Sequence, residues 1–254
     1  MENFRVDLSG KRALVTGGSR GLGLAVAVEL ASGGAEVAIC GRKQENLKSA
    51  LDVLGARGLS AFATAAHLGR PDHVERLFED LSNSFGDIDI LVNNVGMNIF
   101  TPRVSEVDND LWDKIIEGNL KSAFMVSKAA VPMMKKRGGG RIINISSVAA
   151  RKAAPGMGVY CVAKAGLEML TRVLAVELAG YGIRVNAVAP GMIRTEFSKP
   201  FWNKKELLDE FVKGVPLGRI AETEDVVGTV LYLVSGVADY VTGEVITVDG
   251  GSVA

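Results

Sequence analysis

The stretch that decides the fold runs from Lys11 to Gly23 and reads KRALVTGGSRGLG. A short apolar run leads into glycines at the spacing G-x-x-x-G-x-G, and a helical pattern follows over residues 24–32. A strand, a glycine turn and a helix form the start of a dinucleotide-binding fold. The glycines let the main chain approach a pyrophosphate, whose charge meets the helix N-terminus. A glycine cluster also occurs in tight turns, but its place directly after the first strand favours nucleotide binding.

Strands and helices alternate along the rest of the chain. Apolar runs predict strands at residues 11–16, 36–40, 60–65, 88–92, 141–146, 183–189 and 244–248. Helices are predicted at residues 24–32, 44–54, 72–85, 110–136, 160–180, 204–213 and 222–235. This alternation is typical of an α/β protein with a Rossmann-like, doubly wound, parallel seven-stranded sheet and helices on both faces. No linker or repeat divides the sequence, so a single domain over residues 1–254 is expected.

A candidate catalytic group lies in the second half of the chain. Lys164 stands four positions after Tyr160, so on a helix the two side chains share one face. The lysine charge should lower the pKa of the tyrosine towards working pH, which suits a general acid or base. Ser147 follows an apolar strand and should lie at the carboxyl edge of the sheet, where open parallel sheets bind ligands. A helix with a surface lysine is the simpler alternative for this spacing taken alone.

Composition excludes several classes of function. The formal net charge is zero, with 48% hydrophobic and 23% charged residues. This balance indicates neither nucleic-acid nor membrane partners, and no run is long enough for a membrane span. Cys40 and Cys161 lie in apolar contexts without metal-ligand spacing, so buried reduced thiols and no metal site are expected. With no signal-peptide pattern at residues 1–5, a cytoplasmic location is expected.

The chain resembles the short-chain dehydrogenase/reductase (SDR) family over nearly its whole length. The motifs that carry the resemblance are Thr16-Gly17-x-x-x-Gly21-x-Gly23, Asn93-Asn94-Val95-Gly96, Asn119, Ser147, Tyr160-x-x-x-Lys164, Pro190-Gly191 and Val248-Asp249-Gly250-Gly251. The resemblance implies that Tyr160 gives or takes up the proton of the substrate. It also implies that Lys164 lowers the pKa of Tyr160 and binds the nicotinamide ribose, and that Ser147 binds the substrate oxygen. It also implies that Asn119 distorts its helix and helps to hold a water linked to Lys164. A satisfied buried amide is the alternative for Asn119.

The resemblance also implies a set of residues that bind NADP(H), with NAD(H) less favoured. These residues are Gly17, Ser19, Arg20, Gly21, Leu22, Gly23, Arg42, His67, Leu68, Asn94, Gly96, Tyr160, Lys164, Pro190, Gly191, Ile193 and Thr195. The second strand ends at Gly41, where NAD-specific relatives carry an acid. Arg20 and Arg42 should instead bind a 2′-phosphate, unless they are solvated surface arginines. His67 replaces the usual Asp near the adenine, and a surface histidine is an equal alternative.

A substrate lid is expected at about residues 192–215. Phe197, Phe201 and Trp202 in the lid, with Ser147 and Met157, should line an apolar substrate pocket. A hydrophobic cluster packed on the body is the alternative. The loop pair Arg151-Lys152 could contact an acidic substrate, but a solvated pair is favoured.

Together these expectations predict that the protein is an NADP-dependent oxidoreductase that interconverts a carbonyl and an alcohol. Within the family, the chain resembles the carbonyl and retinal reductases. A 3-oxoacyl-[acyl-carrier-protein] reductase and a polyol or sugar dehydrogenase are alternatives, and a non-catalytic dinucleotide sensor is a remote one. Apolar residues beyond the core stripe, Phe124, Met125, Leu167 and Leu170, suggest a partner surface. The resemblance implies a homotetramer, with a dimer as the alternative.

Overall fold

The seven predicted strands form one parallel sheet in the order β3-β2-β1-β4-β5-β6-β7. The computed structural model describes residues 6–254, so the expectation drawn from residues 1–5 lies outside the described part. The strands are β1 (Arg12–Thr16), β2 (Glu36–Gly41), β3 (Ala61–Ala65), β4 (Ile90–Asn93), β5 (Gly140–Ile145), β6 (Ile183–Pro190) and β7 (Val245–Val248). The Rossmann-like fold class is therefore confirmed.

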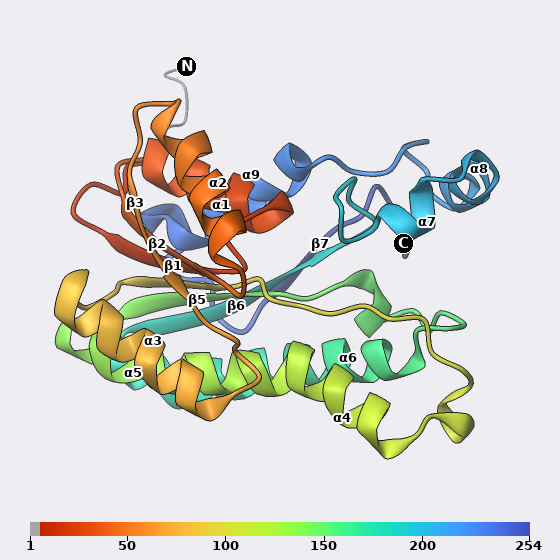
Figure 1. Cartoon of the computed structure of the whole chain (residues 1–254), viewed down its shortest axis with the longest axis horizontal. Coiled ribbons are helices and arrows are strands. Elements are labelled where there is room, and N and C mark those ends of the chain that lie inside the picture. Colours follow the sequence, from red (N-terminus) through yellow and green to blue (C-terminus); the bar gives the residue numbers. More distant parts are fainter. Residues whose placement is uncertain (1–5) are drawn as a thin grey trace.

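Helices cover both faces of this sheet (Figure 1). One face carries α1 (Gly21–Ser32), α2 (Gln44–Gly55) and α9 (Thr223–Val234), and the other carries α3 (Pro71–Ser84), α5 (Ser122–Lys136) and α6 (Gly158–Leu178). A hydrophobic core lies on each face of the sheet, and alternate side chains of β1 point into one or the other. Ala13 and Val15 pack with α1, whereas Leu14 packs with α3 and α5. Burial on both faces explains why the strands read as continuous apolar runs rather than alternating ones.

The strand order determines where in the sheet the candidate site lies. From β1 the chain moves outward to β2 and β3, then returns to place β4 on the other side of β1. This reversal between β1 and β4 is the point where open α/β sheets bind ligands, outside the carboxyl ends of the strands. The register pairs Val15 with Val92 and Val92 with Ile143, so the loops after β1, β4 and β5 begin side by side.

The helix predicted at residues 110–136 is interrupted. It consists of α4 (Asn109–Ile116), a π turn over Glu117–Lys121, and α5. The side-chain Nδ2 of Asn119 donates to the Ile115 carbonyl at 2.8 Å, which takes up an acceptor of the regular helix ladder. Such π turns occur often at functional sites. The distortion that the resemblance implied at Asn119 is therefore present.

The segment expected as a lid contains two helices, α7 (Lys199–Trp202) and α8 (Lys205–Lys213). None of the α8 residues is fully buried. Short 3₁₀ turns that the sequence did not predict occur at Val104–Glu106, Val148–Ala150, Ala179–Tyr181 and Gly236–Ala238. Over residues 6–254, no helix is both long and apolar enough to cross a bilayer.

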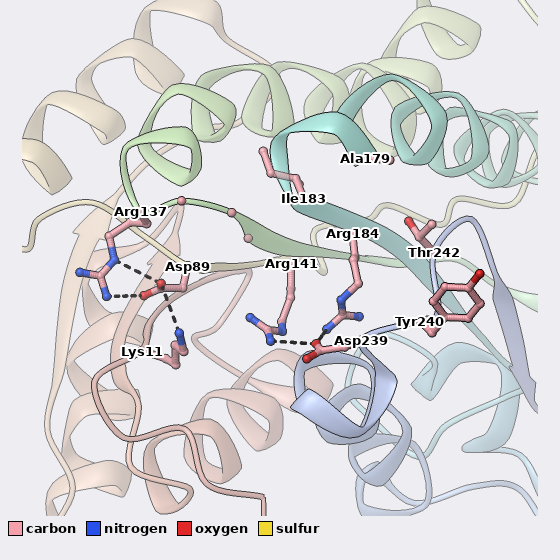
Figure 2. A pocket seen from close by; sticks show the side chains of 14 residues that line it. Lys11, Asp89, Arg137, Arg141, Ala179, Ile183, Arg184, Asp239, Tyr240 and Thr242 are labelled. Atoms are coloured by element: carbon pink, nitrogen blue, oxygen red, sulfur yellow. Dashed lines mark hydrogen bonds and ion pairs between the residues drawn. The ribbon is translucent and has the colours of Figure 1, made fainter.

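A cavity of about 650 Å³ lies at the opposite, amino edge of the sheet (Figure 2). Its charged side chains pair with one another: Asp89 lies 3.0 Å from Arg137 and 3.9 Å from Lys11. Asp239 lies 3.1 Å from both Arg141 and Arg184. These ion pairs join the starts of neighbouring strands, and no residue predicted to be functional lines this cavity.

Candidate active site

The loop after β1 is shaped by its glycines. Gly17 and Gly21 have φ values of 63° and 54°, which side chains with a Cβ rarely adopt. A Cβ on Gly23 would lie 2.3 Å from the Gly17 carbonyl oxygen. Helix α1 begins at Gly21, and its N-cap residue, Arg20, makes no side-chain cap. The first amides of α1 therefore keep their N–H groups for an anion, as a pyrophosphate site needs.

A hydrogen-bonded brace joins the glycine loop to the end of β4. The Thr16 Oγ1 accepts from the Asn94 amide at 2.9 Å and donates to the Val92 carbonyl at 3.2 Å. The Asn94 Nδ2 donates in return to the carbonyls of Thr16 and Gly17, at 3.0 and 3.3 Å. The ends of β1 and β4, which are far apart in sequence, are thus held together where the cofactor is expected to bind.

The glycine loop also adjoins the end of β2. A Cβ on Gly41 would lie 3.1 Å from the Ser19 Oγ. Arg20 and Arg42 are both exposed, and neither guanidinium pairs with another described residue. The structure therefore places two unpaired arginines beside the same stretch of backbone.

The residues expected around the adenine differ in exposure. His67 is exposed, and its Nδ1 accepts from the Gly69 amide at 3.3 Å. Leu68 is 4% exposed and packs in the core, so only its main chain is free to contact a ligand.

Tyr160 and Lys164 lie together on the buried face of α6, with 6% and 3% of their surface exposed. The Lys164 Nζ is 5.6 Å from the centre of the Tyr160 ring. The Ser147 Oγ accepts from the Ala149 amide at 3.2 Å, so its own O–H can donate to the Tyr160 oxygen. The structure thus brings together the three residues that the sequence analysis selected.

The pKa of Tyr160 differs from the expectation. Burial raises the pKa of Tyr160 to about 12, and a hydrogen bond from Ser147 opposes this shift only in part. Burial also lowers the pKa of Lys164 to about 8. The expected fall of the tyrosine pKa towards working pH is therefore absent in this state of the protein, because desolvation of the phenolate outweighs the hydrogen bond from Ser147.

Asn119 is completely buried and its amide is satisfied by the protein. Its Oδ1 accepts from the Met97 amide at 3.0 Å, and its Nδ2 donates to the carbonyls of Met97 and Ile115, each at 2.8 Å. A Cβ on Gly96 would lie 3.2 Å from the Asn119 Oδ1 and 3.6 Å from the Lys164 Nζ. Both side-chain hydrogens of Asn119 are used, so a water relay to Lys164 would have to use the main chain or the second lone pair of Oδ1.

The segment after β6 leads back to the glycine loop. Pro190 ends β6, and the Gly191 amide donates to the Val248 carbonyl at 2.9 Å. Ile193 forms a bridge with Ala221 at the base of the lid. A Cβ on Gly21 would lie 3.4 Å from the Thr195 Cγ2, so the start of the lid faces the glycine loop.

The aromatic residues of the segment expected as a lid make separate contacts. The ring of Phe201 packs on that of Phe100, with the centroids 4.7 Å apart. The Trp202 indole instead donates within the lid, to the Ser198 Oγ at 3.0 Å. Phe197 is 46% exposed, and Met157 packs against the cluster that contains Tyr160.

Sequence reasoning missed Phe100. The signal in the sequence was an aromatic residue in the loop that follows the Asn93–Gly96 motif, where an apolar side chain has no predicted core to join.

Other expectations about individual side chains also need correction. Leu167 is 1% exposed and belongs to the core, whereas Phe124 is 45% exposed as expected. Cys40 is buried, but Cys161 is only partly so. The pair Arg151-Lys152 is not simply solvated, because Arg151 donates to the Thr247 Oγ1 at 2.7 Å.

Comparisons with known proteins agree with this geometry. A family model described as "Enoyl-(Acyl carrier protein) reductase" matches residues 17–252. The protein named "Dehydrogenase/reductase SDR family member 4" from Oryctolagus cuniculus is 42% identical over 98% of this chain and 95% of its own. The protein of the same name from Homo sapiens is also 42% identical, over 98% of this chain and 89% of its own.

Solved structures show the same fold. A gluconate 5-dehydrogenase from Burkholderia cenocepacia, in complex with NADP and tartrate, is 33% identical with a TM-score of 0.92, over 98% of this chain and 97% of that one. A short-chain type dehydrogenase/reductase from Mycobacterium marinum is 35% identical with a TM-score of 0.92, over the same shares of the two chains.

Proposed function

The chain belongs to the short-chain dehydrogenase/reductase family of oxidoreductases, and from this premise we propose that it transfers a hydride between NADP(H) and an apolar carbonyl or alcohol substrate. One observation carries the proposal: Tyr160, Lys164 and the loop of Ser147 meet at the carboxyl edge of the sheet, beside the glycine loop. A buried tyrosine next to a buried lysine is costly, and such groups are typical of sites that move protons.

The glycine loop fits a dinucleotide. Gly17, Gly21 and Gly23 form a surface that a side chain would obstruct, and the uncapped N-terminus of α1 faces it. Lys164 would hold the nicotinamide ribose, and the main chain at Gly96 would face the nicotinamide end. When bound, the cofactor supplies or accepts the hydride.

Tyr160 would act as the acid in the direction of reduction. Its raised pKa keeps the phenol protonated at neutral pH, so it can donate to the substrate oxygen. Once substrate is bound, the O–H of Ser147 would donate to the same oxygen and stabilise the negative charge that develops there. The Lys164 ammonium would then stabilise the phenolate that the proton transfer leaves behind. In the direction of oxidation the same groups take up the hydroxyl proton.

Preference for NADP(H) over NAD(H) follows from charge. No acid stands at Gly41, and Arg20 and Arg42 have no other described partner. Two guanidinium groups near one ribose favour a 2′-phosphate through charge-assisted hydrogen bonds. The complex of the Burkholderia cenocepacia structure with NADP is consistent with this preference.

The lid over residues 192–215 supports an apolar substrate. The Phe201 ring packs on that of Phe100 and so joins the lid to the loop after β4, and we expect this aromatic pair to line the substrate pocket. Exposed apolar surface on a segment that covers a site is typical of a closing lid.

Oxidation of a sugar acid is the second candidate function, because a solved structure with the same fold is a gluconate 5-dehydrogenase. Sugar acids need polar and cationic partners in the pocket. Arg151 and Lys152 could have supplied these, but Arg151 binds β7 and Lys152 donates to the Ser252 carbonyl at 3.3 Å. With both cations engaged elsewhere, the aromatic pair of Phe100 and Phe201 favours an apolar substrate.

A panel of substrates tests the proposal. The purified protein would be mixed with NADPH and aromatic ketones, aliphatic ketones or a 3-oxoacyl thioester, and with NADP⁺ and gluconate, while nicotinamide absorbance is followed. We expect the highest kcat/KM with bulky apolar ketones. Turnover of gluconate alone would establish the second candidate, and a protein that binds NADPH but turns over nothing would be a dinucleotide sensor.

We also propose a homotetramer. Val162, Met169, Val173 and Val176 are exposed and recur at helical spacing, so they form an apolar stripe along α6, and Phe124 on α5 is exposed as well. Contiguous apolar surface of this kind marks an interaction site. A second copy of the chain is the natural partner, because the stripe lies on the long helices away from the candidate active site.

A further inference from the structure

A single buried carboxylate holds both ends of the loop that carries Ser147. The Ser146 Oγ donates to the Glu168 Oε1 at 3.3 Å. At the other end of the loop, the Arg151 Nε lies 3.5 Å from the Glu168 Oε2. Ser147 lies between these two attachments, so its main chain is fixed from both sides.

Glu168 belongs to the catalytic face of α6. It follows Tyr160 and Lys164 at four-residue intervals, which places the three side chains in one row along the helix. Glu168 is only 5% exposed. A buried carboxylate is tolerated only when it is paired and hydrogen-bonded, and both conditions are met by Arg151 and Ser146.

Arg151 also binds β7, which is separated from β5 by β6 in the sheet. It donates to the Thr247 Oγ1 at 2.7 Å and to the Val245 carbonyl at 3.1 Å, both on β7. A guanidinium offers several donors in a fixed plane, so one side chain can join the Ser147 loop to α6 and to β7. A lysine could not make all of these contacts at once.

The contact between Ser146 and Glu168 is one of three polar links between β5 and α6. The Asn144 Nδ2 donates to the Thr171 Oγ1 at 2.8 Å, and the Lys164 Nζ donates to the Ile145 carbonyl at 2.8 Å. The last two residues of β5 and the residue that follows them are therefore linked to three different positions along α6. The link through Glu168 is the one that continues into the Ser147 loop.

We propose that Arg151 and Glu168 are positioning residues that hold the Ser147 hydroxyl in register with the Tyr160 hydroxyl. This inference rests on the proposed function, because it assumes that both hydroxyls bind the substrate oxygen. Catalytic groups must be held to a fraction of an ångström, and a displacement of about 1 Å can cost about 10²-fold in rate. Neither residue touches the glycine loop, so cofactor binding should not depend on them.

Steady-state kinetics of Arg151→Met and Glu168→Gln test the proposal. We expect kcat for the best substrate of the panel to fall about tenfold or more, while the Kd for NADPH, measured by fluorescence titration, changes less than about twofold. Arg172→Met is the matched control, since Arg172 lies 4.0 Å from the same carboxylate but makes no described contact with residues 146–151. It should keep nearly full kcat.

Double variants separate positioning from general stability. If Arg151 acts through Ser147, adding Arg151→Met to Ser147→Ala should cause little further loss of kcat. A purely structural role predicts that the two losses multiply. Arg151→Lys keeps the charge and should recover only part of the kcat, and it serves as the folded variant if Arg151→Met does not fold.

Two failures can be distinguished. If the wild type turns over no carbonyl or alcohol although it binds NADPH, the proposed function is wrong. If the wild type is active and Arg151→Lys and Glu168→Gln lower the melting temperature but leave kcat unchanged, the positioning inference is overturned. Multiplicative losses in the Ser147→Ala background would overturn it as well.

Discussion

The Lys164 Nζ donates a hydrogen bond of 2.8 Å to the carbonyl oxygen of Ile145, two residues before Ser147. This bond ties Lys164 on α6 to the strand that leads into Ser147. It also supplies a main-chain acceptor to an ammonium that is almost fully buried. The geometry of the site and the protonation of Lys164 are therefore linked.

Tyr160→Phe removes the acidic proton and keeps the ring. We expect kcat to fall about 10²–10⁴-fold, the range typical of a lost general acid or base, with NADPH affinity nearly unchanged. Tyr181→Phe is the control, because Tyr181 is 51% exposed and lies outside the site. Activity close to that of the wild type in Tyr160→Phe would contradict the mechanism.

The pH profile of reduction should follow Lys164. Burial places the pKa of Lys164 at about 8, below its usual value, whereas Tyr160 stays protonated up to about pH 12. The profile of kcat/KM, which reports the free enzyme, should be level below pH 8 and decline above it as the ammonium loses its proton. Lys164→Arg keeps its charge, so any activity it retains should show no decline near pH 8. A decline that persists in that variant would assign it to another group.

The choice of cofactor should depend on the residues after β2. Each charge-assisted bond is worth about 1.5–3 kcal/mol, so each arginine should contribute roughly a ten- to hundredfold preference for NADPH over NADH. The double variant Gly41→Asp/Arg42→Leu should lose most of this preference in kcat/KM. Because a Cβ at Gly41 approaches the Ser19 Oγ to 3.1 Å, Ser19 must rotate, and the melting temperature should be recorded as well.

Lys43→Leu is the control for cofactor choice, since Lys43 pairs with Glu45 at 3.3 Å. A wild type that prefers NADH, or a double variant with an unchanged ratio, would show that the arginines do not bind the phosphate.

Two variants of the lid should differ in their effect. Phe201→Ala removes the ring that packs on Phe100, so KM should rise more for bulky apolar ketones than for small ones. Trp202→Ala removes a side chain bound within the lid by Ser198, so it should affect all ketones to a similar extent. Kinetics with a matched pair of bulky and small ketones measure this difference. Equal effects of Phe201→Ala on both ketones would assign Phe201 to packing only.

The apolar stripe on α6 should hold the oligomer together. Met169 and Val176 are 56% and 81% exposed, and a glutamate at either position would place a charge in the proposed interface. We expect Met169→Glu or Val176→Glu to reduce the mass measured by light scattering from that of a tetramer. Val53→Glu, at an exposed position of α2, is the control. An unchanged mass in both stripe variants would place the interface elsewhere.

The sequence alone determined the order of strands and helices along the chain and the motifs that lie together at the candidate site. Strand and helix periodicities are local properties, and so are the spacing of Gly17, Gly21 and Gly23 and the four-residue interval from Tyr160 to Lys164. For this reason every predicted strand is present, and the residues chosen at the strand ends meet at one edge of the sheet.

Tertiary structure decided the features that depend on burial and on partners distant in the chain. The direction of the Tyr160 pKa shift follows from desolvation by surrounding elements, which the Tyr160–Lys164 spacing does not reveal. The sequence predicts a solvated loop cation at Arg151, whereas the fold places Glu168 and Thr247 beside it. Contacts of this kind form only when α6 and β7 pack against β5 and β6, so local sequence patterns do not predict them.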